Sequence, residues 1–106
     1  MNAGELRQKL TIQTLTRTPD GYGGYTKAWN DFATTWAKIQ PLRGDERYKA
    51  QQVMNTVSHK ITLRYLDGIK PQMRAISGSR IFNILAVINV EEKNELIELL
   101  CEEVIS

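Results

Sequence analysis

The residue types that most often carry catalysis are scarce in this chain of 106 residues. It has one histidine, His59, and one cysteine, Cys101, in separate segments, so the paired Cys and His ligands of a zinc site are missing. His59 falls on the apolar face of a predicted strand, which indicates a histidine hydrogen-bonded at the edge of the core rather than a general base. Cys101, in LLCEE, has no cation close to it in the sequence and is predicted to be a small buried residue. A single cysteine also excludes an intrachain disulfide.

The carboxylates could in principle supply acid/base chemistry or a Mg²⁺ site. They occur as adjacent pairs, Asp45-Glu46, Glu91-Glu92 and Glu102-Glu103. Neighbouring side chains on a strand point to opposite faces, so these pairs do not present two converging acids. We therefore expect no catalytic residues, no metal and no cofactor, and predict that the protein is not an enzyme.

The segment TPDGYGGYTKAW, residues 18–29, is rich in glycine. Its Asp20-Gly21 and Gly23-Gly24 pairs allow positive backbone φ at several positions, as a reversing β connection requires. Its glycines do not match the spacing of phosphate-binding loops, and no helix follows them. We predict a long hairpin here.

Aromatic residues gather in and just after this segment. A platform that stacks nucleic-acid bases interleaves such residues with Lys or Arg, and only Lys27 and Lys38 are near. Packing against a protein surface is the favoured interpretation. The aromatic residues are Tyr22, Tyr25, Trp29, Phe32 and Trp36.

Alternating apolar and polar residues predict several short strands. The alternation is clearest in VSHKITLRY, residues 57–65, which predicts a half-buried strand. RIFNILAVINV, residues 80–90, is apolar on both faces and is predicted to be a central strand. Further strands are predicted at 9–16, at 34–42, where Pro41 stops the strand, and at 73–77.

Two segments do not follow this pattern. Residues 43–54 contain strong helix formers, with Asp45 as the expected N-cap, and predict a short helix or a mobile loop that becomes one on contact. For residues 94–104, propensity favours a helix, whereas the short connection from Asn89 to Asn94 favours the second strand of a hairpin. Together the elements predict an all-β fold, a small barrel or sandwich of five to six antiparallel strands with one inserted helix.

Composition predicts one soluble domain spanning residues 1–106. No apolar run approaches the length of a membrane span, and the first ten residues lack the features of a secretion signal, so folding in the cytoplasm is expected. The net charge of +2 is unevenly distributed: residues 1–90 carry 13 Lys+Arg against 6 Asp+Glu, and residues 91–106 carry one lysine against six glutamates. The basic residues are spread over separate segments, which suits protein partners as well as nucleic acid.

Several short motifs follow one another along nearly the whole chain. In their order, spacing and total length they resemble the head-closure proteins, also called head-tail joining or stopper proteins, of long-tailed double-stranded DNA phages. The motifs are Gly4-x-Leu6-Arg7-x-x-Leu10-x-Ile12-Gln13, Asp20-x-x-Gly23-Gly24-x-x-x-x-Trp29, Trp36-Ala37-x-Ile39-x-Pro41-x-x-Gly44-x-Glu46, His59-x-Ile61-x-x-Arg64-Tyr65, Arg80-x-Phe82-x-Ile84, Val87-x-Asn89 and Leu99-x-Cys101-x-Glu103.

The resemblance implies a small barrel subunit without catalytic activity that assembles into a ring at the portal vertex of the capsid. There it would contact the portal or adaptor ring and the tail-completion or tail-terminator protein, close the exit for packaged DNA and offer a platform to the tail. Assembly would take place in the host cytoplasm, and the final location would be the head-tail interface of the virion. No membrane and no sequence-specific DNA binding are implied.

Two groups of residues become candidate sites on this interpretation. The hairpin aromatics Tyr22, Tyr25, Trp29 and Phe32 are expected to anchor on an adjoining component of the ring. The segment around 43–54, with Arg43, Asp45, Glu46, Arg47 and Lys49, is expected either to line or obstruct the DNA channel or to cap one end of the barrel. The main alternative function is a small OB-like barrel that binds nucleic acid.

Overall fold

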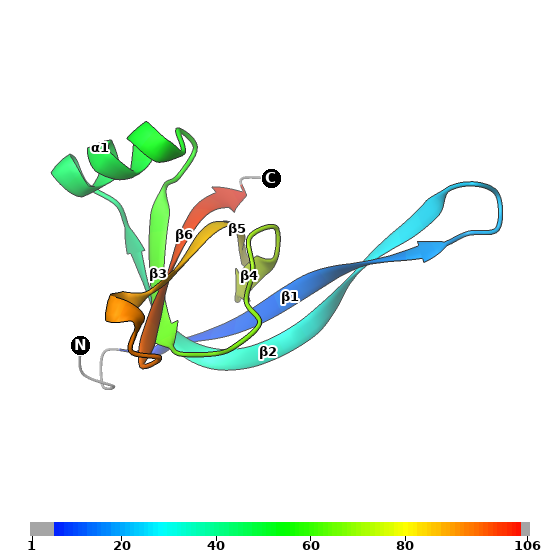
Figure 1. Cartoon of the computed structure of the whole chain (residues 1–106), viewed down its shortest axis with the longest axis horizontal. Coiled ribbons are helices and arrows are strands. Elements are labelled where there is room, and N and C mark those ends of the chain that lie inside the picture. Colours follow the sequence, from blue (N-terminus) through cyan, green and yellow to red (C-terminus); the bar gives the residue numbers. More distant parts are fainter. Residues whose placement is uncertain (1–5, 105–106) are drawn as a thin grey trace.

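The computed structural model describes residues 6–104, apart from the side chain of Val53, so Gly4 of the first motif lies outside the described part. Six strands and one helix of ten residues make up most of it (Figure 1). In chain order they are β1 (Gln8–Pro19), β2 (Tyr25–Pro41), α1 (Gly44–Val53), β3 (His59–Arg64), β4 (Arg74–Ser77), β5 (Arg80–Asn89) and β6 (Leu96–Val104), with a 3₁₀ turn at Val90–Glu92.

The strands form a closed antiparallel barrel in the order β1-β2-β3-β6-β5-β4, which confirms the predicted fold class. Closure leaves the barrel part of each strand paired on both sides, so the barrel has no free edge of its own. The short helix lies in the connection between β2 and β3, near one end of the barrel (Figure 1).

The core follows from the alternation of side chains along each strand. Every second residue of a barrel strand points inward, and these positions carry aliphatic and aromatic side chains that are almost completely buried. Each such side chain stabilises the fold by about 1.5–3 kcal/mol through removal from water. The most deeply buried residues are Leu10, Ile12, Ile61, Leu63, Phe82, Ile84, Leu99 and Cys101.

The prediction that residues 80–90 form a central strand is confirmed by β5, although only one of its two apolar faces is buried. Phe82 and Ile84 are buried on the inner face of β5, whereas Ile88 is 42% exposed. The strand is central in the sheet, paired with β4 and β6, but a small barrel with no second layer has only one face to bury.

For residues 94–104 the strand alternative is confirmed. This segment is β6, paired along its length with β3 and β5. The turn before it contains Glu91, Glu92 and Asn94 at φ values of 54° to 56°, which are unfavourable for residues other than glycine. The Asn89 amide holds this turn, because its Nδ2 donates to Asn94 Oδ1 at 2.7 Å and its Oδ1 accepts from Asn94 N at 3.2 Å. Burial of the apolar face of β6 therefore outweighs the helical propensity of its residues.

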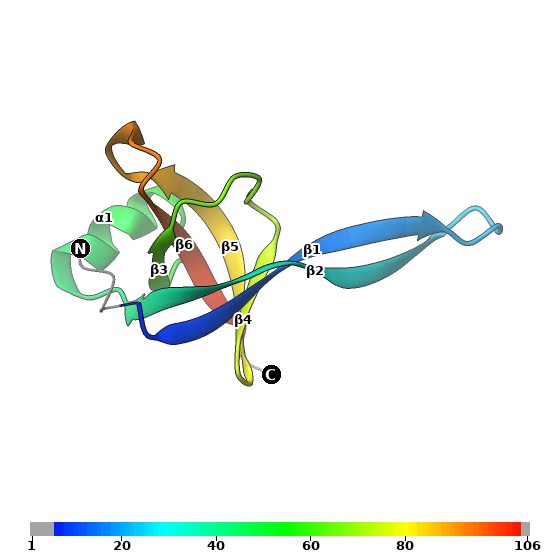
Figure 2. The same ribbon diagram turned by 90° about the horizontal axis from the view of Figure 1, so that it is seen from below.

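Beyond the barrel, β1 and β2 continue as a two-stranded arm. β4 pairs with β1 only at residues 11–13, after which β1 and β2 run on together from Thr14 to the turn near Gly21. A β-bulge opposite Ile12 and Gln13, where Phe32 is the extra residue, lies where the arm leaves the barrel. Both views show the arm projecting away from the body (Figures 1 and 2), and the molecule measures 48 × 28 × 28 Å. The predicted long hairpin is confirmed.

The helix begins two residues earlier than the predicted N-cap implies. Arg43 occupies the N-cap position, without a side-chain capping bond, and Asp45 lies within the first turn instead of capping it. Gly44 has a φ of 56°, which turns the chain into the helix directly after Arg43. Asp45 still stabilises the helix, because carboxylates are favourable near the positive end of the helix dipole.

The buried thiol gives a direct test of the core. Cys101 is 0% exposed, and desolvation raises its pKa to about 12. We expect no reaction with a thiol reagent such as Ellman's reagent in native buffer near pH 8, and one reactive thiol per chain in concentrated guanidinium chloride. Native-state labelling at the rate of free cysteine would contradict the arrangement of β6.

Candidate functional site

The tip of the arm presents two tyrosines to solvent. Asp20 organises the turn, since its Oδ1 accepts from the backbone N–H groups of Tyr22 at 2.7 Å and Gly24 at 3.2 Å. Gly21 and Gly23 have φ values of 84° and 85°, as the reversal requires. Tyr22 is 94% exposed and Tyr25 is 65% exposed, and exposed aromatic side chains on a projecting turn are suited to bury against a partner.

Trp29, in contrast, is held by its own chain. The Arg74 guanidinium lies 4.2 Å from the centre of the Trp29 ring, in a cation–π contact. Arg74 Nε also donates to Gln13 Oε1 at 2.8 Å, and Gln13 Nε2 donates to Asp31 Oδ1 at 2.8 Å. This chain of contacts joins β4, β1 and β2, so Trp29 helps to set the direction of the arm.

Phe32 also packs against its own chain. It is the extra residue of the bulge and is 41% exposed, and its ring covers Gly68 in the loop between β3 and β4. Gly68 has a φ of 95°, which favours glycine, and a side chain there would begin 2.8 Å from Phe32 Cζ and displace the ring. The four predicted anchors therefore do not form one patch: Tyr22 and Tyr25 lie at the tip, and Trp29 and Phe32 lie toward the base.

A fifth aromatic residue, Trp36, is more exposed than Trp29 and was not predicted as a site. It lies on the outer face of the barrel at 57% exposure, with Lys9 directly opposite on β1. Together with Leu6, Thr35 and Arg64 it borders a shallow hollow of about 270 Å³. The sequence places these residues in three separate segments, and only the strand register shows that they are neighbours.

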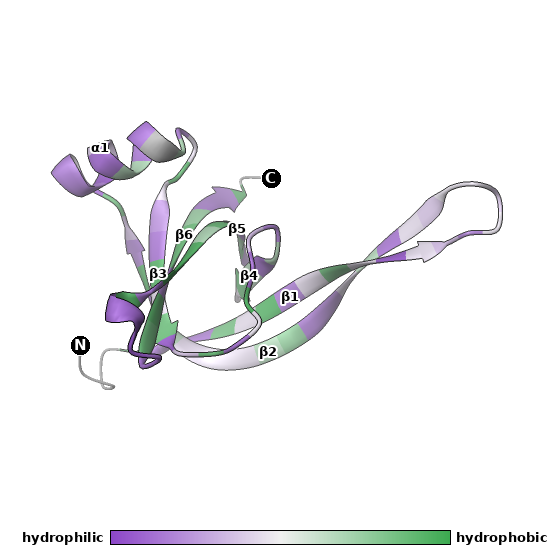
Figure 3. Cartoon of the chain, in the orientation of Figure 1, coloured by the Kyte–Doolittle hydropathy of each residue, from purple (hydrophilic) through white to green (hydrophobic). Residues whose placement is uncertain are grey.

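The predicted gating residues lie on or beside α1, which is largely exposed. The helix is mostly hydrophilic (Figure 3), and only Ala50 and Gln51 are half-buried among its described side chains. Arg43, Arg47 and Lys49 have no ion-pair partner among residues 6–104. A helix that is polar all round gains little from packing on its own barrel.

Few contacts attach the helix to the barrel. Glu46 accepts from Lys60 Nζ at 2.5 Å, and Gln51 Nε2 donates to the carbonyl of Val57 at 3.2 Å. Lys60 also lies 3.6 Å from Glu98 on β6, and these carboxylates, with the Glu46 hydrogen bond contributing most, raise its pKa. An exposed ion pair contributes about 0–1 kcal/mol, so the helix is weakly held.

His59 is hydrogen-bonded at the edge of the core, as predicted. Its Nδ1 lies 2.9 Å from Ser58 Oγ, its Nε2 lies 3.3 Å from an Arg80 Nη2, and its ring packs edge-on against Phe82 at 5.3 Å. Arg80 Nε donates to Glu103 Oε2 at 2.8 Å. A neutral imidazole with its proton on Nδ1 satisfies these contacts, because Nε2 then accepts from Arg80.

The proximity of a serine, a histidine and a carboxylate does not make a nucleophilic site here. Ser58 Oγ accepts from the backbone N–H of Glu103 at 3.1 Å, and the Glu103 carboxylate is engaged by Arg80, which lowers its pKa. A nucleophile needs a base positioned to take its proton and a cavity for the substrate. The hollows beside Met73 and beside Trp36 are lined by other residues.

This cluster predicts a pH dependence of stability. Burial lowers the pKa of His59 despite the attraction of Glu103, and Arg80 and Arg47 lower it further. The unfolded chain therefore binds a proton more readily than the folded chain, so His59 makes stability fall as pH drops below about 6.5 toward the folded pKa. The melting temperature of the wild type should fall between pH 7.5 and 5, and the fall should be smaller in His59→Gln. An identical pH slope in both proteins would contradict this account of His59, which is the only histidine.

Residues 6–104 contain no group of three or more His, Cys, Asp or Glu side chains arranged to hold a metal ion. No helix in that range is long and apolar enough to cross a membrane. The sites that remain are surfaces: the arm, the helical segment and the outer barrel face around Trp36.

Comparison with known proteins matches this architecture. The family model described as phage head completion protein matches residues 1–104. The head completion protein gp16 of Bacillus phage SPP1 is 33% identical over 81 residues, which cover 76% of this chain and 74% of gp16.

Two solved structures share the fold. The solution structure of protein SF1141 from Shigella flexneri 2a matches with a TM-score of 0.80 at 28% identity. The match covers 97% of this chain and 96% of the SF1141 chain. A chain in the virion of a native gene transfer agent particle matches with a TM-score of 0.65 at 23% identity. This match covers 95% of this chain and 97% of the virion chain. The latter similarity concerns the fold alone.

Proposed function

We propose that this chain, which belongs to the phage head completion protein family and is a structural protein of the phage head, forms a ring at the portal vertex. The ring closes the exit for packaged DNA and gives the tail a platform for attachment. The family match over nearly the whole chain carries this proposal. The projecting arm supports it, because a small barrel needs an extension to reach its neighbours.

A ring of identical subunits is closed by contacts between two different surfaces of each subunit, arranged head to tail. The barrel and the arm are different in shape and chemistry, which suits such an arrangement. At the tip, Tyr22 and Tyr25 are the anchors that we assign to an adjoining component, the portal or adaptor ring or the tail-completion protein. Trp29 and Phe32 hold the arm in position, and the exposed parts of their rings add to the surface that contacts this component.

The helical segment is the part that we assign to the DNA channel. Arg43, Arg47 and Lys49 are available to phosphate, and the segment is weakly attached to the barrel. The alternative role, as a cap on the end of the barrel, requires a buried apolar helix face, and the described side chains of α1 supply none. Contact with DNA in this role is independent of its sequence.

A structural, non-enzymatic role follows from the same proposal. The Arg80–Glu103 and Lys60–Glu98 pairs join neighbouring strands, which suits a structural role for these charged groups. We expect the subunit to be made in the host cytoplasm, to be mainly monomeric in solution and to assemble where the portal presents a binding surface.

Electron microscopy of filled heads tests the proposal. Heads purified with this protein should show a ring of added density beneath the portal, and heads made without it should lack that ring. Ring density that is identical in the two samples would show that another protein occupies the position.

A further inference from the structure

One edge of the arm has no strand beside it. From Thr14 to Pro19, β1 pairs with β2 on one side, whereas β4 covers its other side only as far as Gln13. Among residues 6–104 no other strand pairs with this edge. An open strand edge presents backbone N–H and C=O groups that are ready to pair with an extended chain.

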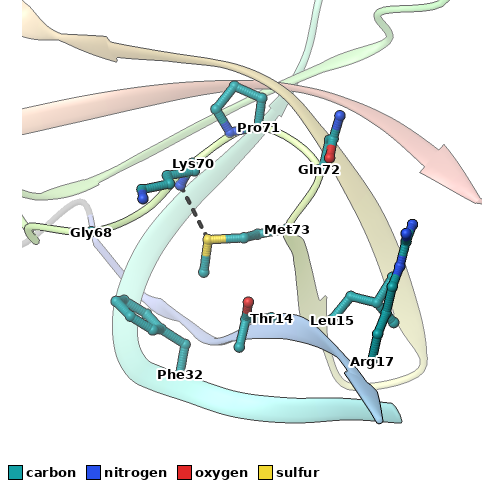
Figure 4. A pocket seen from close by; sticks show the side chains of 9 residues that line it. All are labelled: Thr14, Leu15, Arg17, Phe32, Gly68, Lys70, Pro71, Gln72 and Met73. Carbon is teal, nitrogen blue, oxygen red and sulfur yellow. Dashed lines mark hydrogen bonds between the residues drawn. The ribbon is translucent and has the colours of Figure 1, made fainter. Parts of the chain in front are cut away.

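A groove of about 760 Å³ runs beside this edge (Figure 4). Three of its lining residues are large and apolar. Leu15 comes from β1, Phe32 from β2, and Met73 from the end of the loop between β3 and β4. Met73 is fixed in place, because it is only 7% exposed and its sulfur accepts from the Lys70 backbone N–H at 3.1 Å. The groove therefore offers an apolar floor next to an open edge, as strand-addition sites do.

The charge of the groove indicates the chemistry of its occupant. Arg17 and Lys70 are among its nine lining residues, and none of the nine is acidic. Lys27 lies directly opposite Arg17 across the arm, and like charges in that position are unfavourable. None of these three cations has an ion-pair partner in the described part of the chain, so an acidic segment would relieve their repulsion.

A second copy of this chain fits the groove poorly. Its arm would bring the same two cations, Arg17 and Lys27, against those already there. Its acidic turn, Val90–Glu92, is a 3₁₀ turn with residues in the left-handed region, which cannot extend a sheet. Asp45 and Glu46 lie in a helix, and the acidic strand β6 is already paired on both sides.

We propose that the open edge of β1 binds an extended, acidic and apolar segment of another virion protein as an additional strand of the arm. Its backbone pairs with Thr14–Pro19, its apolar side chains contact Leu15, Phe32 and Met73, and its carboxylates face Arg17 and Lys70. The inference rests on the proposed function, because it assigns one contact surface to the subunit when it is assembled on the head.

Hydrogen exchange of the assembled protein tests the backbone part. Amide exchange at residues 14–18 should slow at least about tenfold in filled heads relative to the free chain, while exchange in the barrel strands stays unchanged. Heads that contain the protein but show unchanged exchange at 14–18 would overturn the inference and leave the proposed function intact. Absence of the protein from the heads would instead count against the proposed function.

Charge reversal tests the side-chain part. Arg17→Glu combined with Lys70→Glu should weaken incorporation into heads roughly tenfold or more, because the charges that steer the acidic segment become repulsive. The matched control, Lys38→Glu with Lys93→Glu, makes the same change in net charge at two positions outside the groove and should be incorporated normally. Equal behaviour of the two variants would overturn the charge argument.

Zero-length carbodiimide cross-linking of assembled heads identifies the occupant, since the reagent joins lysine to carboxylate groups in contact. We expect Lys70 to be linked to an Asp or Glu of a different protein. A link to a glutamate of a second copy of this chain, or no link at Lys70, would overturn the assignment.

Discussion

Heads assembled with a variant lacking residues 45–52 should incorporate the protein and then lose their DNA. The deletion removes most of α1, including Arg47 and Lys49, which we assign to the channel. If this segment obstructs the exit, the large majority of filled heads should become empty after purification. Nuclease sensitivity of the genome in purified heads measures this directly.

The barrel should tolerate this deletion. The two ends of the segment are already close together, because Pro41 pairs with His59 and the Leu42 N–H donates to the Ser58 carbonyl at 3.0 Å. The losses are the Glu46–Lys60 ion pair and the Gln51 bond to Val57, which together contribute about 1–2 kcal/mol. A soluble variant with an unchanged circular dichroism spectrum in the β region is the required control.

A second variant separates charge from bulk in the same segment. Arg47→Gln with Lys49→Gln keeps the helix and removes two cations that face solvent. DNA retention equal to wild type in the deletion variant would rule out gating and leave the barrel cap as the role of α1. Leakage in the deletion variant alone would assign the effect to the bulk of the helix and not to phosphate contacts.

Replacement of Tyr22 and Tyr25 by serine should nearly abolish attachment of the subunit to portal-bearing heads. Aromatic anchors at the centre of an interface each contribute about 2 kcal/mol or more, so the pair should weaken attachment between roughly 30-fold and roughly 1,000-fold. Both side chains are exposed, so the melting temperature should change by less than about 3 °C. Incorporation at a series of protein concentrations gives the ratio.

Tyr65→Ser is the matched control for the arm tyrosines. Tyr65 is also exposed, at 39%, but lies at the end of β3 away from the arm tip. Wild-type attachment of the double tyrosine variant would show that the arm tip is not an anchor. Trp29→Ala is a less selective test, because it also removes the contact with Arg74 that orients the arm.

The sequence was sufficient to predict an all-β fold, a small barrel or a sandwich, because its strands follow local rules. Alternating side chains, Pro41 at the end of β2 and the glycines at the turn near Gly21 determine where strands begin and end. The same rules identified residues 80–90 as a central strand but could not show that only one of its two apolar faces is buried. The number of layers in a fold is a tertiary property, and alternation within one strand does not reveal it.

The candidate site was less predictable, because it depends on which strands are neighbours. The sequence grouped four aromatic residues as anchors, and the structure exposes Tyr22 and Tyr25 at the arm tip. Trp29 and Phe32 instead contact Arg74 and Gly68, which are far away in the sequence. Arg17 and Lys70 border one groove although 53 positions separate them. Such juxtapositions arise from strand register and from the bulge at Phe32, and neither has a signal in residue composition.

The genome content of heads made without this protein tests the central claim most directly. We predict that such heads package DNA and then lose it, that they acquire no tails, and that purified protein added before the loss restores both properties. Heads that keep their genome and attach tails without the protein would contradict the account. Salt-sensitive binding of the free chain to naked DNA, with no effect on heads, would favour the small-barrel nucleic-acid binder instead.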